Sequence, residues 1–368
     1  MKQKKRLAIV STHPIQYQVP LFKKLNKSGL EIDVFFASKH GFSSKFKDIG
    51  FNKKFDWDIN LLKGYNYYFS RNSIKNADDW KLSFSNLEHY LKKKKYDALL
   101  FFGWGNILYL KALYIAKKLG ITTILRVETN LYSKISIFKK IFKTLILKIL
   151  FKNIDFFLYI GKLNKEFYKK LGVSDFKLFS APYFVDNKFF ESKSKKEKKN
   201  IKKFLFVGKL IKRKNPILFL KLAKHFKYKK KFHFNVVGTG KLLDDCKSYI
   251  KKNKLSNVSL LGFKNQKDIK NVYKNNNILI ITSEYETWGL VINEAMASGI
   301  PVISSVNCGA SHDLVKNGKT GFVYKNEKDL INKVLKITKS KKIENIMKKN
   351  VKKKIQNYSI NKTILSIK

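Results

Sequence analysis

Short runs of β-branched and aromatic residues alternate with longer stretches of helical periodicity along almost the whole chain. This alternation is typical of β-α-β units, which build parallel sheets covered by helices. Candidate strands lie at residues 7–11, 32–37, 98–102, 122–126 and 156–160 in the first half, and at 204–207, 234–237, 258–261, 278–282, 302–304 and 321–324 in the second. The sequence therefore predicts an α/β protein with a doubly wound parallel sheet in each half.

The polar, heavily charged stretch 191–203 separates the two halves. A chain of 368 residues is also long enough for two domains with separate cores. We therefore expect an N-terminal Rossmann-like domain at 1–190, a linker at 191–203, a C-terminal Rossmann-like domain at 204–345 and a helical tail at 346–368. Such domains face each other across a cleft, and their ligands bind at the carboxyl ends of the strands.

Positive charge is the most unusual property of the composition. The 78 basic and 26 acidic residues give a formal net charge of +52 at pH 7, which attracts polyanions and anionic membrane surfaces. Four of the basic residues are arginine, the residue that reads bases and phosphates in a bidentate way, and the lysines are spread along the whole chain. Nucleic-acid binding is therefore not expected as the main function. Whether the charge is functional or follows codon usage stays open.

The sequence also bears on the cellular location. Cys246 and Cys308 are too few for a disulfide framework and have no partner at metal-binding spacing, which fits a reducing cytoplasm. The apolar run at 7–10 is too short for a signal peptide, and the charge-free stretch 295–312 is broken by glycine and proline. We expect a cytoplasmic protein that is soluble or peripheral on the inner membrane face.

The most informative motif is ITSEYETWGLVINEAMASGIPVI at 281–303, a strand, a polar loop and a helix that starts near Gly289. The first helical residues, Leu290 and Val291, would offer unpaired N–H groups that suit a diphosphate. Glu286 and Glu294 flank this anion site and would accept hydrogen bonds from sugar hydroxyls. The alternative stays open that Glu286 merely favours the helix start and that Glu294 is a solvated helix residue.

Two further strand-to-loop motifs carry candidate phosphate contacts. In FLFVGKLIKRKNP, a strand runs into Gly208, and Lys209 and Lys214 follow on the loop. Two ammonium groups near a diphosphate leaving group would each contribute on the order of a few kcal/mol. In NVVGTGKL, Gly238 follows the next strand and loosely resembles a phosphate-cradling loop. The loop around Gly309 is the fourth piece.

Taken together and in this order, these pieces resemble the nucleotide-binding half of glycosyltransferase family 4, retaining enzymes of the GT-B fold. The resemblance is most specific in the E-x7-E motif, Glu286 to Glu294. It implies that Glu294 holds the ribose hydroxyls and that Glu286 lies by the donor sugar. The basic pair that grips the diphosphate maps to Lys209 and Lys214.

Three positions depart from the family pattern. Lys209 stands where arginine is common and gives up a bidentate contact. Asp313 replaces the more usual glutamate, and Ala310 replaces a second glycine. These departures affect the grip on the donor and the shape of the loop.

The N-terminal half resembles a subgroup of family 4 with an HPIQYQ-type opening, which the segments FFGWGN, RVETN, YIGKLNKEFY and APYFVDN also fit. The resemblance places six residues on the acceptor or donor-sugar side of the cleft: His13, Gln16, Tyr17, Trp104, Arg126 and Glu128. Two alternatives stay open, namely that His13 only contacts a helix start and that Trp104 only packs.

Two other segments have patterns with a possible function. Asp56 and Asp58 have a spacing that a different transferase fold uses for a divalent metal, but they lie far from the nucleotide motifs, so we expect no catalytic metal and no cofactor. The stretch 136–153 predicts a basic amphipathic helix, with Phe138, Phe142, Leu145 and Ile149 on its apolar side and Lys139, Lys140 and Lys143 on the opposite side. Such a helix suits an anionic membrane surface, and an ordinary domain helix stays an equal alternative.

The sequence thus predicts a retaining glycosyltransferase that takes a nucleotide-diphosphate sugar as donor and a glycan or lipid-linked glycan as acceptor, in surface polysaccharide or lipopolysaccharide biosynthesis. Two other classes remain as alternatives. One is a non-enzymatic binder of polyanions or membrane surfaces on the same fold, and the other is a nucleotide-sugar epimerase. The residues do not identify the base, the sugar, the acceptor or the oligomeric state.

Overall fold

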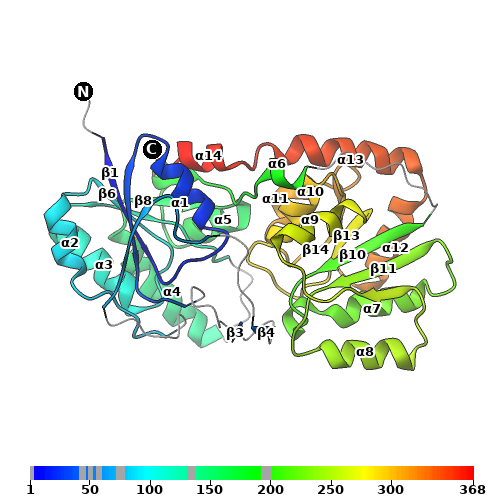
Figure 1. The fold of residues 1–368 in the computed structure, drawn as a ribbon. Coiled ribbons are helices and arrows are strands. Elements are labelled where there is room, and N and C mark those ends of the chain that lie inside the picture. Colours follow the sequence, from blue (N-terminus) through cyan, green and yellow to red (C-terminus); the bar gives the residue numbers. More distant parts are fainter. Residues whose placement is uncertain are drawn as a thin grey trace.

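The computed structural model describes residues 4–40, 47–48, 53–54, 60–71, 79–130, 137–191 and 201–368. Two α/β domains lie side by side, each built on one parallel sheet with helices on both faces (Figure 1). This architecture confirms the predicted fold class.

The first domain holds a seven-stranded sheet in the order β5-β2-β1-β6-β7-β8-β9, with every neighbouring pair parallel. Its strands are β1 (Arg6–Ser11), β2 (Glu31–Phe36), β5 (Asn66–Phe69), β6 (Ala98–Phe101), β7 (Thr122–Leu125), β8 (Phe156–Tyr159) and β9 (Leu178–Ser180). Its helices are α1 (Val19–Asn26), α2 (Leu87–Lys94), α3 (Ile107–Lys118), α4 (Ile137–Lys152), α5 (Lys162–Lys170), the 3-10 turn η1 (Asp175–Lys177) and α6 (Asn187–Phe190). A short antiparallel pair joins β3 (Lys47–Asp48) to β4 (Lys53–Lys54).

The second domain holds a six-stranded parallel sheet in the order β12-β11-β10-β13-β14-β15. Its strands are β10 (Lys202–Val207), β11 (Phe232–Val237), β12 (Val258–Leu260), β13 (Ile278–Ile281), β14 (Val302–Ser305) and β15 (Gly321–Tyr324). Its helices are the 3-10 turn η2 (Lys212–Lys214), α7 (Pro216–His225), α8 (Leu243–Lys252), α9 (Gln266–Lys274), α10 (Leu290–Ala297), α11 (Ser311–Leu314), α12 (Glu327–Thr338) and α13 (Lys341–Ile355). The last helix of the chain is α14 (Ile360–Leu365).

Both sheets are buried on both faces, which explains why their strands read as continuous apolar runs. In β1, Ala8 and Val10 pack toward α2, α3, α4 and α5, whereas Leu7 and Ile9 pack toward α1 and α14. In β10, Phe204 and Phe206 point toward α7 and α12, while Leu205 points toward α9 and α10. The alternation of side chains along each strand therefore fills two cores in each domain.

All eleven predicted strands are present, with ends that differ by at most two residues. The sequence analysis did not predict β5, β9 or the β3–β4 pair. β5 and β9 are the edge strands of the first sheet, and an edge strand packs fewer side chains, so its apolar signal is weaker. In the part of the chain that the structure describes, no helix is both long and apolar enough to cross a bilayer.

The C-terminal segment, predicted as a helical tail at 346–368, returns to the first domain. After α13, which runs along the second domain, α14 lies against the first domain close to α1 (Figure 1). Thr363 Oγ1 donates to the Pro182 carbonyl (2.7 Å), and Ile364 belongs to the first domain's core. The predicted linker also ends earlier, because Lys202 and Lys203 already pair with Phe232 and His233 in β10 and β11.

Candidate active site

Three loops meet at the carboxyl edge of the second sheet. Gly208 follows β10 and donates its N–H to the Val237 carbonyl (3.0 Å), and Gly238 follows β11 and donates to the Gly262 carbonyl (2.9 Å). Gly238 has φ +139°, and a Cβ there would overlap the Gly208 carbonyl oxygen. Gly238 is therefore needed so that the two loops can touch. Lys209 comes directly after Gly208 at this edge.

The loop after β13 ends in Gly289, the N-cap of α10, as the sequence predicts. Its φ is +103°, and a Cβ would lie 2.8 Å from Cys308 Sγ, so both the backbone and the space require glycine. The left-handed residue turns the chain so that α10 starts at Leu290, where the first helical N–H groups have no carbonyl within the helix.

Glu286 is held by two basic side chains. Only 5% of its surface is exposed, one carboxylate oxygen pairs with Lys214 Nζ, and the other accepts from Arg213 Nη1 (3.1 Å). Both basic residues come from η2, and Thr282 Oγ1 fixes this turn by donating to the Lys214 carbonyl (2.9 Å). A buried carboxylate without a partner would be costly, so the two cations stabilise its charged form.

The predicted residues Lys214, Glu286, Gly289 and Val291 line one small cavity beside the ends of β10 and β13. Its volume is about 10 Å³, roughly the room for one water molecule. The ion pair between Glu286 and Lys214 lies in the wall of this cavity.

Glu294 lies on α10, and Tyr273 from α9 donates its hydroxyl to Glu294 Oε2 (2.7 Å). Burial raises the pKa of Glu294 to about 7, although the Tyr273 hydrogen bond acts in the opposite direction. Tyr273 is fully buried and part of the core between α9 and α10. Glu294 is therefore a positioned carboxyl group whose charge changes near neutral pH.

Glu128 connects the two domains. Its Oε1 accepts from Tyr17 (2.8 Å) and from Tyr183, and its Oε2 accepts from Thr287 Oγ1 (3.2 Å) in the second domain. Burial, together with the Glu128 carboxylate, raises the pKa of both tyrosines. The Arg126 guanidinium lies over the Tyr183 ring, 4.6 Å from its centroid. Three predicted residues, Tyr17, Arg126 and Glu128, thus gather beside the loop of Glu286.

The other predicted residues of the first domain lie in two different places. Gln16 Nε2 donates to Gln266 Oε1 of α9 (2.5 Å), which is another contact between the domains. His13 Nδ1 lies 2.9 Å from Thr12 Oγ1, and its ring packs edge-on against His40. Trp104 packs against the core of the first domain, and Lys143 of α4 lies over its ring. The structure therefore brings Gln16 to the second domain. The residues named here as contacts of His13 and Trp104 belong to the first domain.

Sequence reasoning missed five residues that contact the predicted ones. They are Asn130, Tyr183, Arg213, Tyr273 and Thr287. Asn130, Tyr183 and Thr287 lie inside motifs that were recognised, RVETN, APYFVDN and the E-x7-E segment. The partners of Asn130 and Thr287 come from the other domain, whereas Tyr183 contacts Glu128 from a distant segment of the same domain. Arg213 is one of four arginines and stands next to Lys214, which was a usable signal. Tyr273 gave none, because only the packing of α9 on α10 brings it to Glu294.

Asp313 and Ala310, two of the departures noted in the sequence, follow β14, and Asp313 contacts the first domain. The backbone N–H of Lys162, at the start of α5, donates to both carboxylate oxygens of Asp313 (3.0 and 3.2 Å). Ala310 is fully buried and donates its N–H to the Trp288 carbonyl (2.9 Å). The neighbouring Gly309 is required, since a Cβ there would overlap the Thr287 carbonyl. This loop thus supports the segment that carries Glu286.

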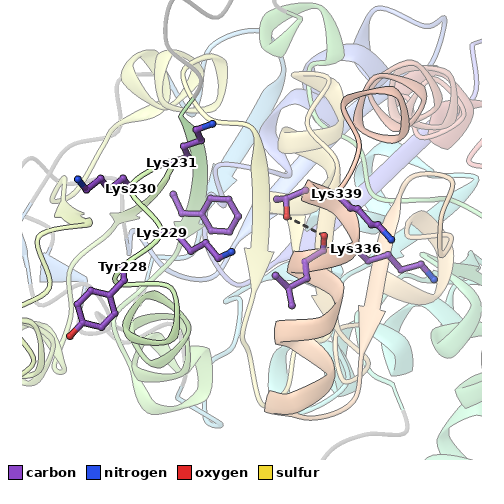
Figure 2. Close-up of a pocket in the computed structure, with 9 residues that line it drawn as sticks. Tyr228, Lys229, Lys230, Lys231, Lys336 and Lys339 are labelled. Carbon is purple, nitrogen blue, oxygen red and sulfur yellow. Dashed lines mark hydrogen bonds between the residues drawn. The ribbon is translucent and has the colours of Figure 1, made fainter.

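A much larger hollow, of about 870 Å³, lies elsewhere on the second domain. Figure 2 shows Lys229, Lys230 and Lys231 on one side of it and Lys336 and Lys339 on the other. These residues precede β11 or lie at the end of α12, so the hollow is at the opposite edge of the sheet from the loops described above. Its size alone does not make it the active site.

Among the described residues, no group of three His, Cys, Asp or Glu side chains comes together in a way that suits a metal ion. Asp56 and Asp58 lie outside the described residues.

Comparison with known proteins agrees with this geometry. Residues 187–354 match the family model described as glycosyl transferases group 1. This match confirms the resemblance at the level of that broad group, and it covers the predicted donor residues of the second domain. Family 4 and the HPIQYQ-type subgroup stay predictions.

Individual relatives match part of the chain. An Escherichia coli UDP-Gal:alpha-D-GlcNAc-diphosphoundecaprenol alpha-1,3-galactosyltransferase is 35% identical over 179 residues, 46% of this chain and 45% of the relative. A Campylobacter jejuni alpha-1,4-N-acetyl-D-galactosaminyltransferase named for a PP-undecaprenol substrate is 28% identical over 167 residues, 45% of this chain and 44% of the relative. The chain thus spans about half the length of the curated relatives it matches.

Solved structures show that the likeness in fold extends over the whole chain. Anabaena HepE in complex with UDP superposes with a TM-score of 0.75 at 14% identity, covering 99% of this chain and 98% of that one. A glycosyltransferase from Rickettsia africae gives a TM-score of 0.74 at 15% identity, covering 98% and 96%. The two parallel-sheet domains therefore have the GT-B arrangement.

Proposed function

We propose that this protein is a retaining glycosyltransferase that moves a sugar from a nucleotide-diphosphate sugar to a glycan or lipid-linked glycan in surface polysaccharide or lipopolysaccharide biosynthesis. The observation that carries the proposal is the meeting of Lys214, Glu286 and the start of α10 around one cavity at the carboxyl edge of the second sheet. This edge is where ligands of doubly wound sheets bind. The names of the two bacterial relatives support a lipid-diphosphate-linked acceptor.

The donor's diphosphate must displace Glu286 from Lys214. Both groups are anionic and compete for the same ammonium, and the cavity of about 10 Å³ leaves no room for a phosphate while the pair is closed. Arg213 bonds the other carboxylate oxygen and the Tyr285 carbonyl (3.3 Å), so it keeps Glu286 in place when Lys214 turns to the phosphate. Glu286 is then available to accept a hydrogen bond from a sugar hydroxyl.

The transfer breaks the bond between the anomeric carbon and the diphosphate oxygen, forms a bond from that carbon to the acceptor hydroxyl oxygen, and passes the hydroxyl proton to the departing diphosphate. Negative charge accumulates on the departing diphosphate. Lys209, Lys214 and the N–H groups of Leu290 and Val291 would stabilise that charge, each cation by on the order of a few kcal/mol. Glu294 would hold the ribose and so fix the donor's orientation.

On the acceptor side, Glu128 and the two tyrosines bonded to it face the loop of Glu286 across the domain boundary. We propose that Arg126, Tyr17 and Gln16 bind acceptor or donor sugar here, with His13 and Trp104 farther along the same edge.

The test is a panel of UDP-, GDP- and ADP-sugars at moderate salt, followed by calorimetric binding and by slow release of free nucleotide. One donor should bind and be hydrolysed by the wild type. Glu294→Ala should weaken binding by about tenfold or more, since it loses charged hydrogen bonds. Glu286→Ala should lower turnover more than binding.

Equal donor affinity and equal turnover in both variants would overturn the assignment. If no sugar nucleotide binds more tightly to the wild type than to Glu294→Ala, while nucleic acid or anionic vesicles bind both, the protein is a polyanion binder. Interconversion of the donor sugar without any acceptor would instead identify an epimerase.

A further inference from the structure

Helix α4 is apolar on two opposite faces. Leu147 and Phe151 are buried in the core of the first domain, and Leu150 packs against that core. The other face exposes five large apolar side chains, each with between 48% and 69% of its surface accessible. They are Ile141, Phe142, Leu145, Ile146 and Ile149, and we call them the α4 apolar face.

The spacing of these five residues makes them one stripe. Positions i, i+1, i+4, i+5 and i+8 fall within an arc of roughly 140° on a helix of 3.6 residues per turn. Single exposed apolar residues are ordinary, but a contiguous patch marks an interaction site. An ordinary domain helix would turn Phe142, Leu145 and Ile149 toward the core, and the structure turns them away from it.

Charge indicates what covers this face. The 26 residues at 129–154 contain six lysines and no acidic residue, and Lys148 and Lys152 are exposed on the same side of the helix as the apolar stripe. A second copy of the chain would bring an identical basic face and a second net charge of +52 against it, which is repulsive. An anionic lipid surface offers both an apolar layer and opposite charge.

We propose that the α4 apolar face docks into the surface of an anionic lipid bilayer, with the helix lying in the plane of the interface. Lys148 and Lys152 would keep their ammonium groups at the headgroups while their stems lie along the apolar layer. In the view of Figure 1, α4 lies along the lower side of the first domain. Its five apolar side chains are exposed with both domains in place, so docking does not require the domains to separate.

Docking also has a consequence for the acceptor, which rests on the proposed function. Trp104 lies in the loop after β6, and Lys143 Nζ of α4 lies 4.7 Å from the centroid of its ring. Helix α4 thus contacts the loop after β6, at the carboxyl edge of the first sheet, through a side chain outside its apolar face. A lipid-linked acceptor held in the bilayer would reach the cleft from this side.

The test uses the full chain and vesicles sedimented with the protein. One vesicle type contains equal parts of phosphatidylglycerol and phosphatidylcholine, and the other contains phosphatidylcholine alone. The wild type should bind the anionic vesicles, and the double variant Phe142→Ser/Ile149→Ser should partition at least about tenfold less. A matched control, Phe176→Ser/Tyr228→Ser, removes two large side chains elsewhere that are more exposed than Phe142 and Ile149, and it should bind as the wild type does.

The single variant Phe142→Ser and a thermal unfolding curve for each protein guard against misfolding. Binding of the double variant as tight as that of the wild type would overturn the proposal, because the lysines alone would then explain it. A wild-type dimer that the double variant makes monomeric would overturn it too, because the face would then join two copies. Release of nucleotide in solution, measured in parallel, should be unchanged by these substitutions, so a failure here is separate from a failure of the proposed function.

Discussion

At the scale of single residues, the ion pairs of Glu286 set the resting state of the site. Lys214 and Arg213 come from the same short turn but take different oxygens of one carboxylate. The Lys214 side chain is mostly buried, whereas nearly half of the Arg213 side chain is accessible. Water therefore screens the Arg213 contact more, and the pair with Lys214 is the stronger obstacle to a phosphate.

Glu294 makes nucleotide binding depend on pH. Its pKa is raised to about 7 by burial, so the carboxylate that would accept both ribose hydroxyls exists mainly above pH 7. Donor affinity should rise by about tenfold between pH 6 and pH 8 as the charged fraction rises. Isothermal titration with the donor at several pH values measures this, and Glu294→Gln should flatten the profile. A wild-type profile as flat as that of the variant would contradict the assigned role.

The same group has the opposite effect on the stability of the free protein. The folded-state pKa lies above the ordinary value of 4.5, so the folded state holds the proton more tightly than the unfolded state. The contribution of protonated Glu294 to the free energy of unfolding is complete below pH 4.5 and is lost as the pH rises through 7. Relative to Glu294→Gln, the free energy of unfolding should fall by up to about 3 kcal/mol over that range. Chemical unfolding of both proteins at several pH values measures this difference.

Site residues were predictable from the sequence where one short segment contains both the functional side chain and the loop or helix start that positions it. Glu286, Glu294 and Gly289 share one motif, and the structure places Gly289 at the start of α10 as expected. Arg213 and Tyr273 act through side chains brought in by η2 and α9. Their roles depend on tertiary packing, which a motif does not contain.

At the scale of elements, the start of α10 depends on Gly289. Gly289→Ala would place a side chain at φ +103° and a Cβ 2.8 Å from Cys308 Sγ. Backbone strain of this kind costs about 1–3 kcal/mol, and the contact adds to it. Urea unfolding should show a loss of stability of at least that size, and donor affinity should fall because the first N–H groups of the helix move.

Two controls separate strain from contact. Gly262 has φ +67° and open space where a Cβ would lie, so Gly262→Ala should cost the strain alone. Adding Cys308→Ala to Gly289→Ala removes the sulfur and should recover part of the stability. Full recovery would show that backbone strain is unimportant at Gly289. No recovery would show that the contact with the Cys308 sulfur is unimportant.

Elements buried on both faces were easy to predict, since their apolar runs are continuous. Helix α4 shows the limit of that reasoning. Its sequence pattern predicts an apolar side and a lysine side, but Leu147 and Phe151 rather than Phe142 and Leu145 reach the core. Hydrophobic periodicity identifies an apolar side of a helix but not what packs against it. Helix α4 has two apolar sides, and the core of the first domain covers one of them.

At the scale of the whole molecule, contacts between the domains close the cleft. Gln16 reaches Gln266, and the Lys162 N–H reaches Asp313. The Asn130 amide donates to the carbonyls of Glu286 and Thr287 (3.4 and 3.1 Å). These bonds hold the loop of Glu286 against the first domain. The sequence predicted a cleft between two domains, but it contained no information on how far the cleft is closed.

Asn130 is therefore the residue through which closure is best tested. Asn130→Ala removes these two amide bonds and also the one that Asn130 Oδ1 accepts from the Tyr285 hydroxyl (3.3 Å), so the open form should be more populated and the radius of gyration from small-angle scattering should increase. Donor affinity should stay within about threefold, because Lys214 and α10 belong to the second domain, whereas turnover should fall by about tenfold as the two halves align less often. Asn350→Ala, which removes a bond to the Lys319 carbonyl within the second domain, should leave both quantities unchanged. If Asn130→Ala keeps the wild-type radius and turnover, these bonds do not control closure, and the donor must enter through movement of the Glu286–Lys214 pair alone.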